Sequence, residues 1–172
     1  PIPNTLINLN VTIDQQPIIN KWIKTFKIDA ILLSGGNDIG NIPQRDVTEN
    51  YLLSWAEKNR KPVLGICRGM QMMGVYAGGS LVKIDGHVGA RHKLNICDGN
   101  KHIFPKTVNS YHNKALKELP YEFKVLAISE DGNLEAMSHN DLEWEGWMWH
   151  PEREKKFSNL DLIRFQRLIN GK

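Results

Sequence analysis

The sequence predicts an α/β fold built on parallel strands. Two short aliphatic runs, residues 28–33 (IDAILL) and 62–66 (PVLGI), each lead into a glycine-containing loop. Unbroken aliphatic runs of this length suit strands that are covered on both faces. A helical stretch separates the two runs, so strand, helix and strand are expected to form a right-handed βαβ unit.

The helix of this unit is predicted over residues 48–59. Thr48 offers a hydroxyl for the N-cap, and the apolar side chains after it repeat with helical spacing. These side chains are Tyr51, Leu52, Trp55 and Ala56. A second helix is predicted after Cys67, and it is expected to end before the Gly78-Gly79 pair, because glycine commonly follows a helix.

The elements further along the chain are shorter. Residues 81–111 are expected to form short strands and functional loops. Residues 123–129 and 134–137 flank an Asp131-Gly132 pair, and this pattern predicts a β-hairpin. A short strand is predicted over residues 147–149. An amphipathic helix over residues 158–169, with Ser158 as its N-cap, closes the chain.

Composition and charge narrow the classes of function. The 172 residues include 22 Lys and Arg against 19 Asp and Glu, a formal net charge of +3, with no block of basic residues. This balance argues against nucleic acid as the main partner. The sequence has no apolar stretch long enough to cross a membrane and no signal-peptide pattern at its start. Two cysteines are too few for a disulfide framework, so we expect a single-domain cytoplasmic protein.

The sharpest local motif is Gly-Ile-Cys-Arg-Gly at residues 65–69, between the second strand and its helix. A G-x-C-x-G pattern in this position is typical of a nucleophile elbow, where small residues permit a sharp turn that projects the central side chain. The turn also places the Cys67 sulfur at a helix N-terminus, where the helix dipole favours the reactive thiolate. The alternative for this pentapeptide alone is a buried structural cysteine.

A thiolate nucleophile needs a base, and the best candidate is His150 in the segment Trp-His-Pro-Glu. In extended backbone, His150 and Glu152 face the same side, so the carboxylate can accept the imidazole proton and fix the tautomer. Cysteine, histidine and glutamate would then form a triad. The Ser-Gly-Gly-Asn loop at residues 34–37 ends the neighbouring strand. A backbone N–H there, together with that of Arg68, could bind an oxyanion, although the glycines are equally compatible with a simple tight turn.

Seven segments resemble the class I glutamine amidotransferase-like family in the family's own order. They match in particular its γ-glutamyl hydrolase branch, which includes γ-glutamyl-GABA hydrolase. The segments are SGGNDI (34–39), RDVTE (45–49), PVLGICRGMQ (62–71), GGSL (78–81), VNSYHN (108–113), DGNLEA (131–136) and WHPE (149–152). The resemblance implies a flavodoxin-like αβα sandwich with an open, mostly parallel sheet. It also implies hydrolysis of a γ-glutamyl amide through a cysteine thioester, without a cofactor.

The resemblance assigns roles to particular residues. It implies Cys67 as the nucleophile, His150 as the base and acid, and Glu152 as the orienting carboxylate. Gly36 and Arg68 would supply backbone N–H groups to the oxyanion.

The same resemblance implies a site for the α-amino and α-carboxylate groups of the glutamyl moiety. Gln71 would contribute to it, together with the loop formed by Asn109, Ser110, Tyr111 and His112. The backbone of that loop could bind the substrate while its side chains only support the backbone. Glu49 would either bind the ammonium group or brace the site.

The sequence leaves open which amine or amidate the hydrolysis releases. The short segment NDIGNIPQRD is similar to that of bacterial γ-glutamyl-CDP-amidate hydrolases of capsule biosynthesis. One alternative is a glutaminase subunit that delivers ammonia to a partner synthetase, and another is a non-catalytic glutamate-binding protein. The expected partner is a small γ-glutamyl substrate, with neither nucleic acid nor membrane, and a homodimer is left open. Residues 1–172 are expected to form one domain that lacks the family's first strand and helix.

The remaining candidate residues carry weaker patterns. Cys97 has no glycine-bracketed turn, so we expect a structural or loop thiol. His87, His92 and His102 lack regular metal-ligand spacing and no cysteine pair accompanies them, so no metal site is predicted. His92 is a candidate for lining the leaving-group pocket.

Overall fold

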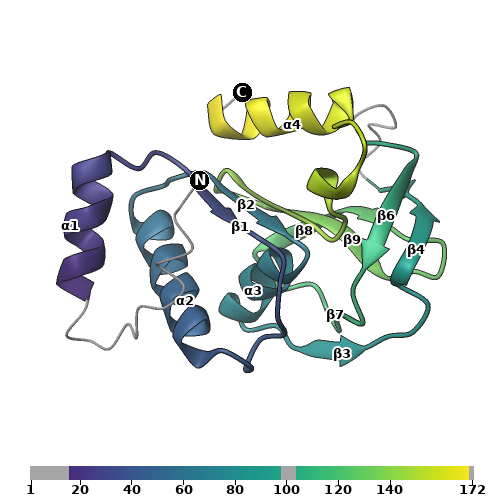
Figure 1. Cartoon of the computed structure of the whole chain (residues 1–172), viewed down its shortest axis with the longest axis horizontal. Helices are drawn as coiled ribbons and strands as arrows, with labels where there is room; N and C mark the ends of the chain where they lie inside the picture. The colour runs from purple at the N-terminus through teal and green to yellow at the C-terminus, as the bar shows by residue number, and fades with distance from the viewer. Residues whose placement is uncertain (1–15, 98–103, 171–172) are drawn as a thin grey trace.

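A six-stranded sheet forms the centre of the computed structural model, which describes residues 16–97 and 104–170 (Figure 1). The strands lie in the order β1-β2-β10-β9-β8-β5. Three of them pair in parallel: β1 (Ile31–Leu33), β2 (Val63–Ile66) and β10 (Trp144–Trp147). The other three extend the sheet with antiparallel pairing: β9 (Leu134–His139), β8 (Phe123–Ile128) and β5 (Asn95–Ile96).

Helices cover both faces of this sheet and make it the middle layer of an αβα sandwich. Three helices pack on one face: α1 (Gln16–Phe26), α2 (Pro43–Lys58) and α3 (Arg68–Tyr76). The helix α4 (Asn159–Asn170) lies on the other face (Figure 1). There Leu168 packs in one cluster with Leu64 and Trp147. Alternate residues of β2 serve the two faces, since Val63 packs with the first group of helices and Leu64 with α4.

Two small sheets and one short turn complete the described part of the chain. The strand β3 (Leu81–Lys83) pairs with β7 (Lys114–Leu116), and β4 (Val88–Lys93) pairs with β6 (Thr107–Tyr111), both antiparallel. A 3-10 turn, η3 (Pro151–Arg153), links the end of β10 to the segment before α4.

The structure confirms the predicted α/β class, the βαβ unit and the β8–β9 hairpin, with three local corrections. The helix α2 begins five residues before Thr48, at Pro43, because proline's fixed φ suits the first turn. Thr48 therefore lies within the helix rather than at its N-cap, and its hydroxyl donates to the Gln44 carbonyl at 2.8 Å. The last central strand ends at Trp147 rather than spanning residues 147–149. The helix α1, whose residues Ile19 and Ile23 are buried, was not predicted.

No helix among residues 16–97 and 104–170 is both long and apolar enough to cross a membrane.

The predicted N-cap of the last helix is confirmed, because the Ser158 hydroxyl accepts the Leu160 backbone N–H at 3.2 Å.

Candidate active site

Cys67 occupies the sharp turn between β2 and α3. Its backbone has φ +50° and ψ −106°, a conformation that is strained for a residue with a side chain. Its N–H donates to the Trp147 carbonyl at 2.6 Å and its carbonyl accepts the Gln71 N–H at 3.1 Å, so the turn runs directly into the helix. This is the elbow geometry that the pentapeptide predicted.

The two bracketing glycines are required by space. A Cβ on Gly65 would lie 2.5 Å from the Met73 sulfur and 2.6 Å from the backbone of Gly69. A Cβ on Gly69 would lie 2.1 Å from the Leu33 carbonyl oxygen, which is backbone and cannot move aside. The helix α3 thus packs against β1 and β2 so closely that only hydrogen fits at either position.

The expected low thiol pKa is not what the structure shows. Burial raises the pKa of the Cys67 thiol to about 11, although the backbone N–H of Arg68 and the charge of Arg153 both act to lower it. The charges of Glu152 and Glu135 add to the increase. The prediction considered the helix dipole but not burial, which disfavours the charged thiolate. In the resting site Cys67 is therefore a protonated thiol that needs a base.

His150 is placed to be that base by a carboxylate two residues along the chain. Its Nδ1 lies 2.6 Å from Oε1 of Glu152. The pair forms through the 3-10 turn η3 and not through the extended backbone that the sequence suggested, because Pro151 starts the turn. Partial burial acts to raise the pKa of Glu152, but the hydrogen bond from His150 and the charges of His150 and Arg153 outweigh it and lower the pKa. A charged Glu152 holds the proton on Nδ1 and leaves Nε2 to exchange protons with substrate groups.

The side chain of Asn109 fixes the backbone of His150. Its Oδ1 accepts the His150 N–H at 2.9 Å, and its Nδ2 donates to the His150 carbonyl at 2.8 Å. The imidazole itself lies against Gly35, where a Cβ would come within 2.5 Å of the ring, and edge-on to the ring of Tyr111. Gly35, Tyr111 and the Glu152 carboxylate therefore restrict the ring position from three sides.

The three candidate groups meet at one edge of the sheet. Gly35, Cys67 and His150 follow β1, β2 and β10, which are neighbouring parallel strands. The carboxyl ends of such strands are where ligands bind in open α/β sheets. The geometry therefore brings together the predicted oxyanion loop, nucleophile and base.

The predicted oxyanion loop is held by Arg45 of α2. The guanidinium donates to the carbonyls of Ser34 at 2.7 Å and Gly35 at 3.2 Å, and to Oδ1 of Asn37 at 3.2 Å. Because the Gly35 carbonyl points to Arg45, the N–H of Gly36 across the same trans peptide points the opposite way. Gly36 has φ +144°, and a Cβ there would lie 2.4 Å from the Arg45 guanidinium, so glycine is needed.

A buried ion network joins this loop to the elbow. Glu49 accepts from Nε of Arg45 at 2.7 Å and from a guanidinium nitrogen of Arg68, whose other terminal nitrogen pairs with Asp46. Asp46 also accepts the Gly40 N–H at 2.7 Å. Both carboxylate oxygens of Glu49 are occupied by arginines, which favours the bracing alternative over direct binding of an ammonium group.

The other predicted substrate residues are mostly engaged within the protein. Gln71 donates to the Lys114 carbonyl at 2.9 Å, and Ser110 donates to the His87 carbonyl at 2.7 Å. His112 contacts the Lys114 carbonyl through Nδ1 at 3.0 Å, whereas Tyr111 is partly exposed beside His150. Their role in binding the glutamyl moiety stays a prediction, with the backbone of this loop as the better candidate.

Cys97 is an exposed free thiol, in keeping with a loop residue, and His102 lies outside the described residues.

Similarity to known proteins identifies the family. The family model "Peptidase C26" matches residues 7–152, which is most of the chain. The chain belongs to this family of glutamine amidotransferase-like amidohydrolases. This membership confirms the family-level resemblance that the motifs indicated.

Two relatives of this Peptidase C26 chain differ in the activity that their names state. A gamma-glutamyl-CDP-amidate hydrolase from Campylobacter jejuni is 32% identical over 143 residues, covering 80% of this chain and 68% of that protein. A glutamine-hydrolyzing GMP synthase subunit from Pyrococcus furiosus is 32% identical over 148 residues, covering 83% and 76%. Among solved structures, a putative GMP synthase subunit from Thermoplasma acidophilum superposes with a TM-score of 0.70 at 24% identity, covering 86% and 74%. That likeness confirms the fold.

Sequence reasoning missed two groups of residues in this Peptidase C26 domain. Arg45 and Asp46 belong to the RDVTE motif, and their positions beside Glu49 on one face of a helix could have indicated a network. His87, His92, His112 and Glu135 converge in space although their sequence spacing is irregular.

Proposed function

We propose that this chain hydrolyses a γ-glutamyl amide bond through a thioester on Cys67, with His150 as general base and acid and Glu152 as the residue that orients it. The observation that carries the proposal is the meeting of the strained cysteine turn, the glutamate-paired histidine and the arginine-held glycine loop at the carboxyl ends of three adjacent strands.

In the first step, the Cys67 thiol is the nucleophile and His150 is the base. Because the pKa of Cys67 is raised to about 11, the sulfur attacks the γ-carbonyl carbon as its proton passes to Nε2 of His150. The backbone N–H groups of Gly36 and Arg68 are the candidates to stabilise the oxyanion. The imidazolium then gives its proton to the departing nitrogen, which breaks the C–N bond and leaves the γ-glutamyl thioester. Water, deprotonated by His150, hydrolyses the thioester and releases glutamate.

For the leaving group we propose an amidate or amine that carries phosphate. The similarity to gamma-glutamyl-CDP-amidate hydrolase supports this choice. A second support is Arg153, whose guanidinium lies 4.4 Å from the centre of the Tyr111 ring, which itself contacts the His150 ring. A positive charge beside the base suits a phosphate group on the leaving side of the scissile bond.

The experiment compares a γ-glutamyl nucleotide amidate, γ-glutamyl-GABA and free glutamine as substrates of the purified chain. We expect turnover of the nucleotide amidate, abolished in Cys67→Ser. In Arg153→Gln, the KM for the nucleotide amidate should rise about 10-fold or more while that for free glutamine, whose leaving group is ammonia, changes little, because a charge-assisted contact contributes about 1.5–3 kcal/mol. Lys156→Gln, which removes a positive charge three residues further along the chain, is the matched control. Unchanged turnover in Cys67→Ser would contradict the mechanism, and equal effects of Arg153→Gln on both substrates would contradict the leaving-group assignment.

The second candidate function is a glutaminase component that passes ammonia to a synthetase. The similarity to the glutamine-hydrolyzing GMP synthase of Pyrococcus furiosus supports it. Strict preference for free glutamine, with low activity until a synthetase is added, would favour this candidate over the hydrolase.

A further inference from the structure

Four ionisable side chains outside the proposed triad converge in the protein interior, and we call them the histidine–glutamate cluster. Its members are His87, His92, His112 and Glu135. One potential ligand atom from each lies within 4.8 Å of the others. They come from the loop before β4, from β4, from the residue after β6 and from β9, so the cluster ties together segments far apart in the sequence.

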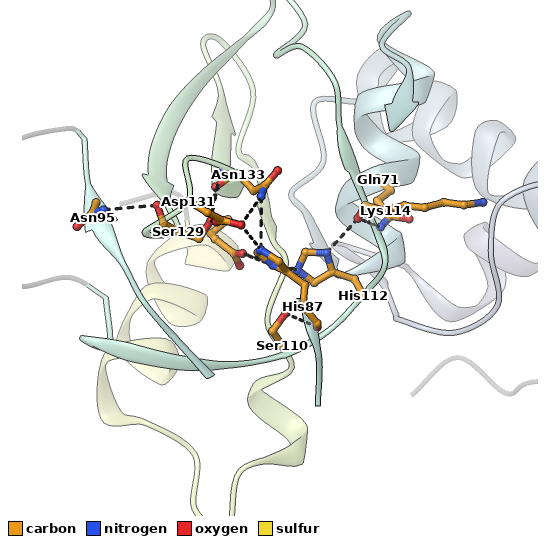
Figure 2. Close-up of polar contacts among 10 residues, drawn as sticks. Gln71, His87, Asn95, Ser110, His112, Lys114, Ser129, Asp131 and Asn133 are labelled. Atoms are coloured by element: carbon orange, nitrogen blue, oxygen red, sulfur yellow. Dashed lines mark hydrogen bonds and ion pairs between the residues drawn. The ribbon is translucent and has the colours of Figure 1, made fainter. Parts of the chain in front are cut away.

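Hydrogen bonds on the outer side of two of the rings fix where their protons are. Nε2 of His87 lies 2.9 Å from the Asp131 carboxylate, and Nδ1 of His112 lies 3.0 Å from the Lys114 carbonyl (Figure 2). Carboxylate and carbonyl oxygens only accept, so these nitrogens carry the protons. In a neutral ring, Nδ1 of His87 and Nε2 of His112 then present lone pairs, and these two atoms face each other at 3.3 Å.

The carboxylate of Glu135 completes this set of electron-pair donors. Its Oε1 lies 3.5 Å from Nδ1 of His87 and 3.7 Å from Nε2 of His112. Glu135 is fully buried, and neither of its oxygens has a hydrogen-bond partner among the described residues. The buried Nε2 of His92 likewise has no such partner in that part of the chain. Unpartnered acceptors in a protein interior are costly, so a positive species is needed between them.

The spacing of the donors matches a tetrahedral metal ion. Ligands held about 2.0–2.1 Å from a tetrahedral Zn²⁺ stand about 3.3–3.4 Å apart. The three distances measured here, 3.3, 3.5 and 3.7 Å, are close to that edge length. A ring nitrogen of His92, whose ring centre is 4.0 Å from that of His87, supplies the fourth corner. Outer partners such as Asp131 on a metal-binding histidine are the usual arrangement.

We propose that the histidine–glutamate cluster binds one divalent transition metal, with Zn²⁺ as the ion it fits best. All four ligand positions belong to the protein, so the site is closed and structural. It would reinforce the strand that holds the candidate base. Asn109 and Tyr111 of β6 contact His150, whereas Ser110 of β6 and His112, the residue after it, turn to the side of His87.

The test measures zinc bound by the full chain, purified without a polyhistidine tag, after chelator treatment and titration with ZnCl₂. We expect about one zinc per chain, bound with the same affinity in Cys67→Ser, which excludes the active-site thiol as the ligand. Glu135→Gln and His92→Gln should lose stoichiometric binding. Asp131→Asn, at a partly exposed position, should weaken binding about 10- to 100-fold and covers the case in which the buried variants fail to fold.

His139→Gln is the matched control, because it removes an imidazole that lies outside the cluster. It should bind zinc like the unmodified chain. Substitution with Co²⁺ should give the intense visible absorption of a tetrahedral site. An unmodified chain that binds no zinc, zinc binding that disappears in Cys67→Ser, or unchanged affinity in Asp131→Asn would overturn the proposal and leave a shared proton as the positive species.

Discussion

The role of the glycine loop can be tested by comparing two glycines with positive φ. Gly36 has φ +144° and Gly40 has φ +96°, so alanine at either position introduces backbone strain of about 1–3 kcal/mol. The two positions differ in the room that they leave for a side chain. A Cβ on Gly36 would lie 2.4 Å from the Arg45 guanidinium, whereas a Cβ on Gly40 meets nothing within 4 Å.

In Gly36→Ala the guanidinium must retreat by about 1 Å to restore an ordinary contact. The atom that must move is Nη1, which donates to Oδ1 of Asn37 at 3.2 Å. Because the guanidinium is a rigid plane, this displacement also weakens the 2.7 and 3.2 Å hydrogen bonds from Nη2 to the loop carbonyls, which loosens the peptide that aims the Gly36 N–H. Losing one oxyanion donor typically costs about 10²–10³ in kcat. We therefore expect kcat to fall about 10²-fold in Gly36→Ala and to stay within about threefold in Gly40→Ala.

The assay is steady-state hydrolysis of γ-glutamyl-p-nitroanilide, with thermal unfolding of both variants to show that each is folded. The role of the loop is refuted if folded Gly36→Ala keeps the kcat of the unmodified enzyme, or if Gly40→Ala loses as much activity as Gly36→Ala.

Burial and side-chain contacts give three further predictions. Burial raises the pKa of Asp161 to about 6, above its usual 3.8, so the folded state favours the protonated form and the stability of the protein falls as pH rises from about 4 to 6. In urea unfolding, Asp161→Asn should therefore stabilise the protein by about 2–3 kcal/mol at pH 7 and by little at pH 3.5. Equal effects at both pH values would contradict this prediction. In a variant with Cys97 replaced by serine, the rate at which iodoacetamide alkylates Cys67 should rise about tenfold per pH unit between pH 7 and 10, because the pKa of Cys67 is about 11. An alkylation rate that reaches a plateau below pH 8 would instead indicate a thiolate of low pKa. Asn109→Leu should lower kcat about 10-fold or more with little change in KM, because it removes both side-chain hydrogen bonds to the His150 backbone. A change in KM alone would indicate instead that Asn109 binds the substrate.

What the sequence predicted well is local. Residues 65–69 are enough to predict the elbow, because the close approach of α3 to β1 and β2 requires glycine at positions 65 and 69. The pairing of His150 with Glu152 also depends on neighbours in the chain. Its route through a 3-10 turn differs from the prediction, because Pro151 favours a turn over extended backbone.

What the sequence did not predict depends on the assembled interior. The helix dipole suggested a thiolate at Cys67, but burial by residues from other elements decides its pKa. The histidine–glutamate cluster joins residues in and beside the β4–β6 sheet to Glu135 on β9 of the central sheet, so its members have no regular spacing in the sequence. The substrate roles of Gln71 and residues 109–112 stay predictions, since their side chains mostly bond within the protein.

The central claim is that Cys67 forms the covalent intermediate, and one measurement addresses it directly. The protein is incubated with an electrophilic glutamine analogue, digested with protease and mapped by mass spectrometry. We predict a single adduct on the peptide that contains Cys67, and its loss in His150→Asn. An adduct on Cys97 alone, or no adduct while γ-glutamyl amides are still hydrolysed, would contradict the claim.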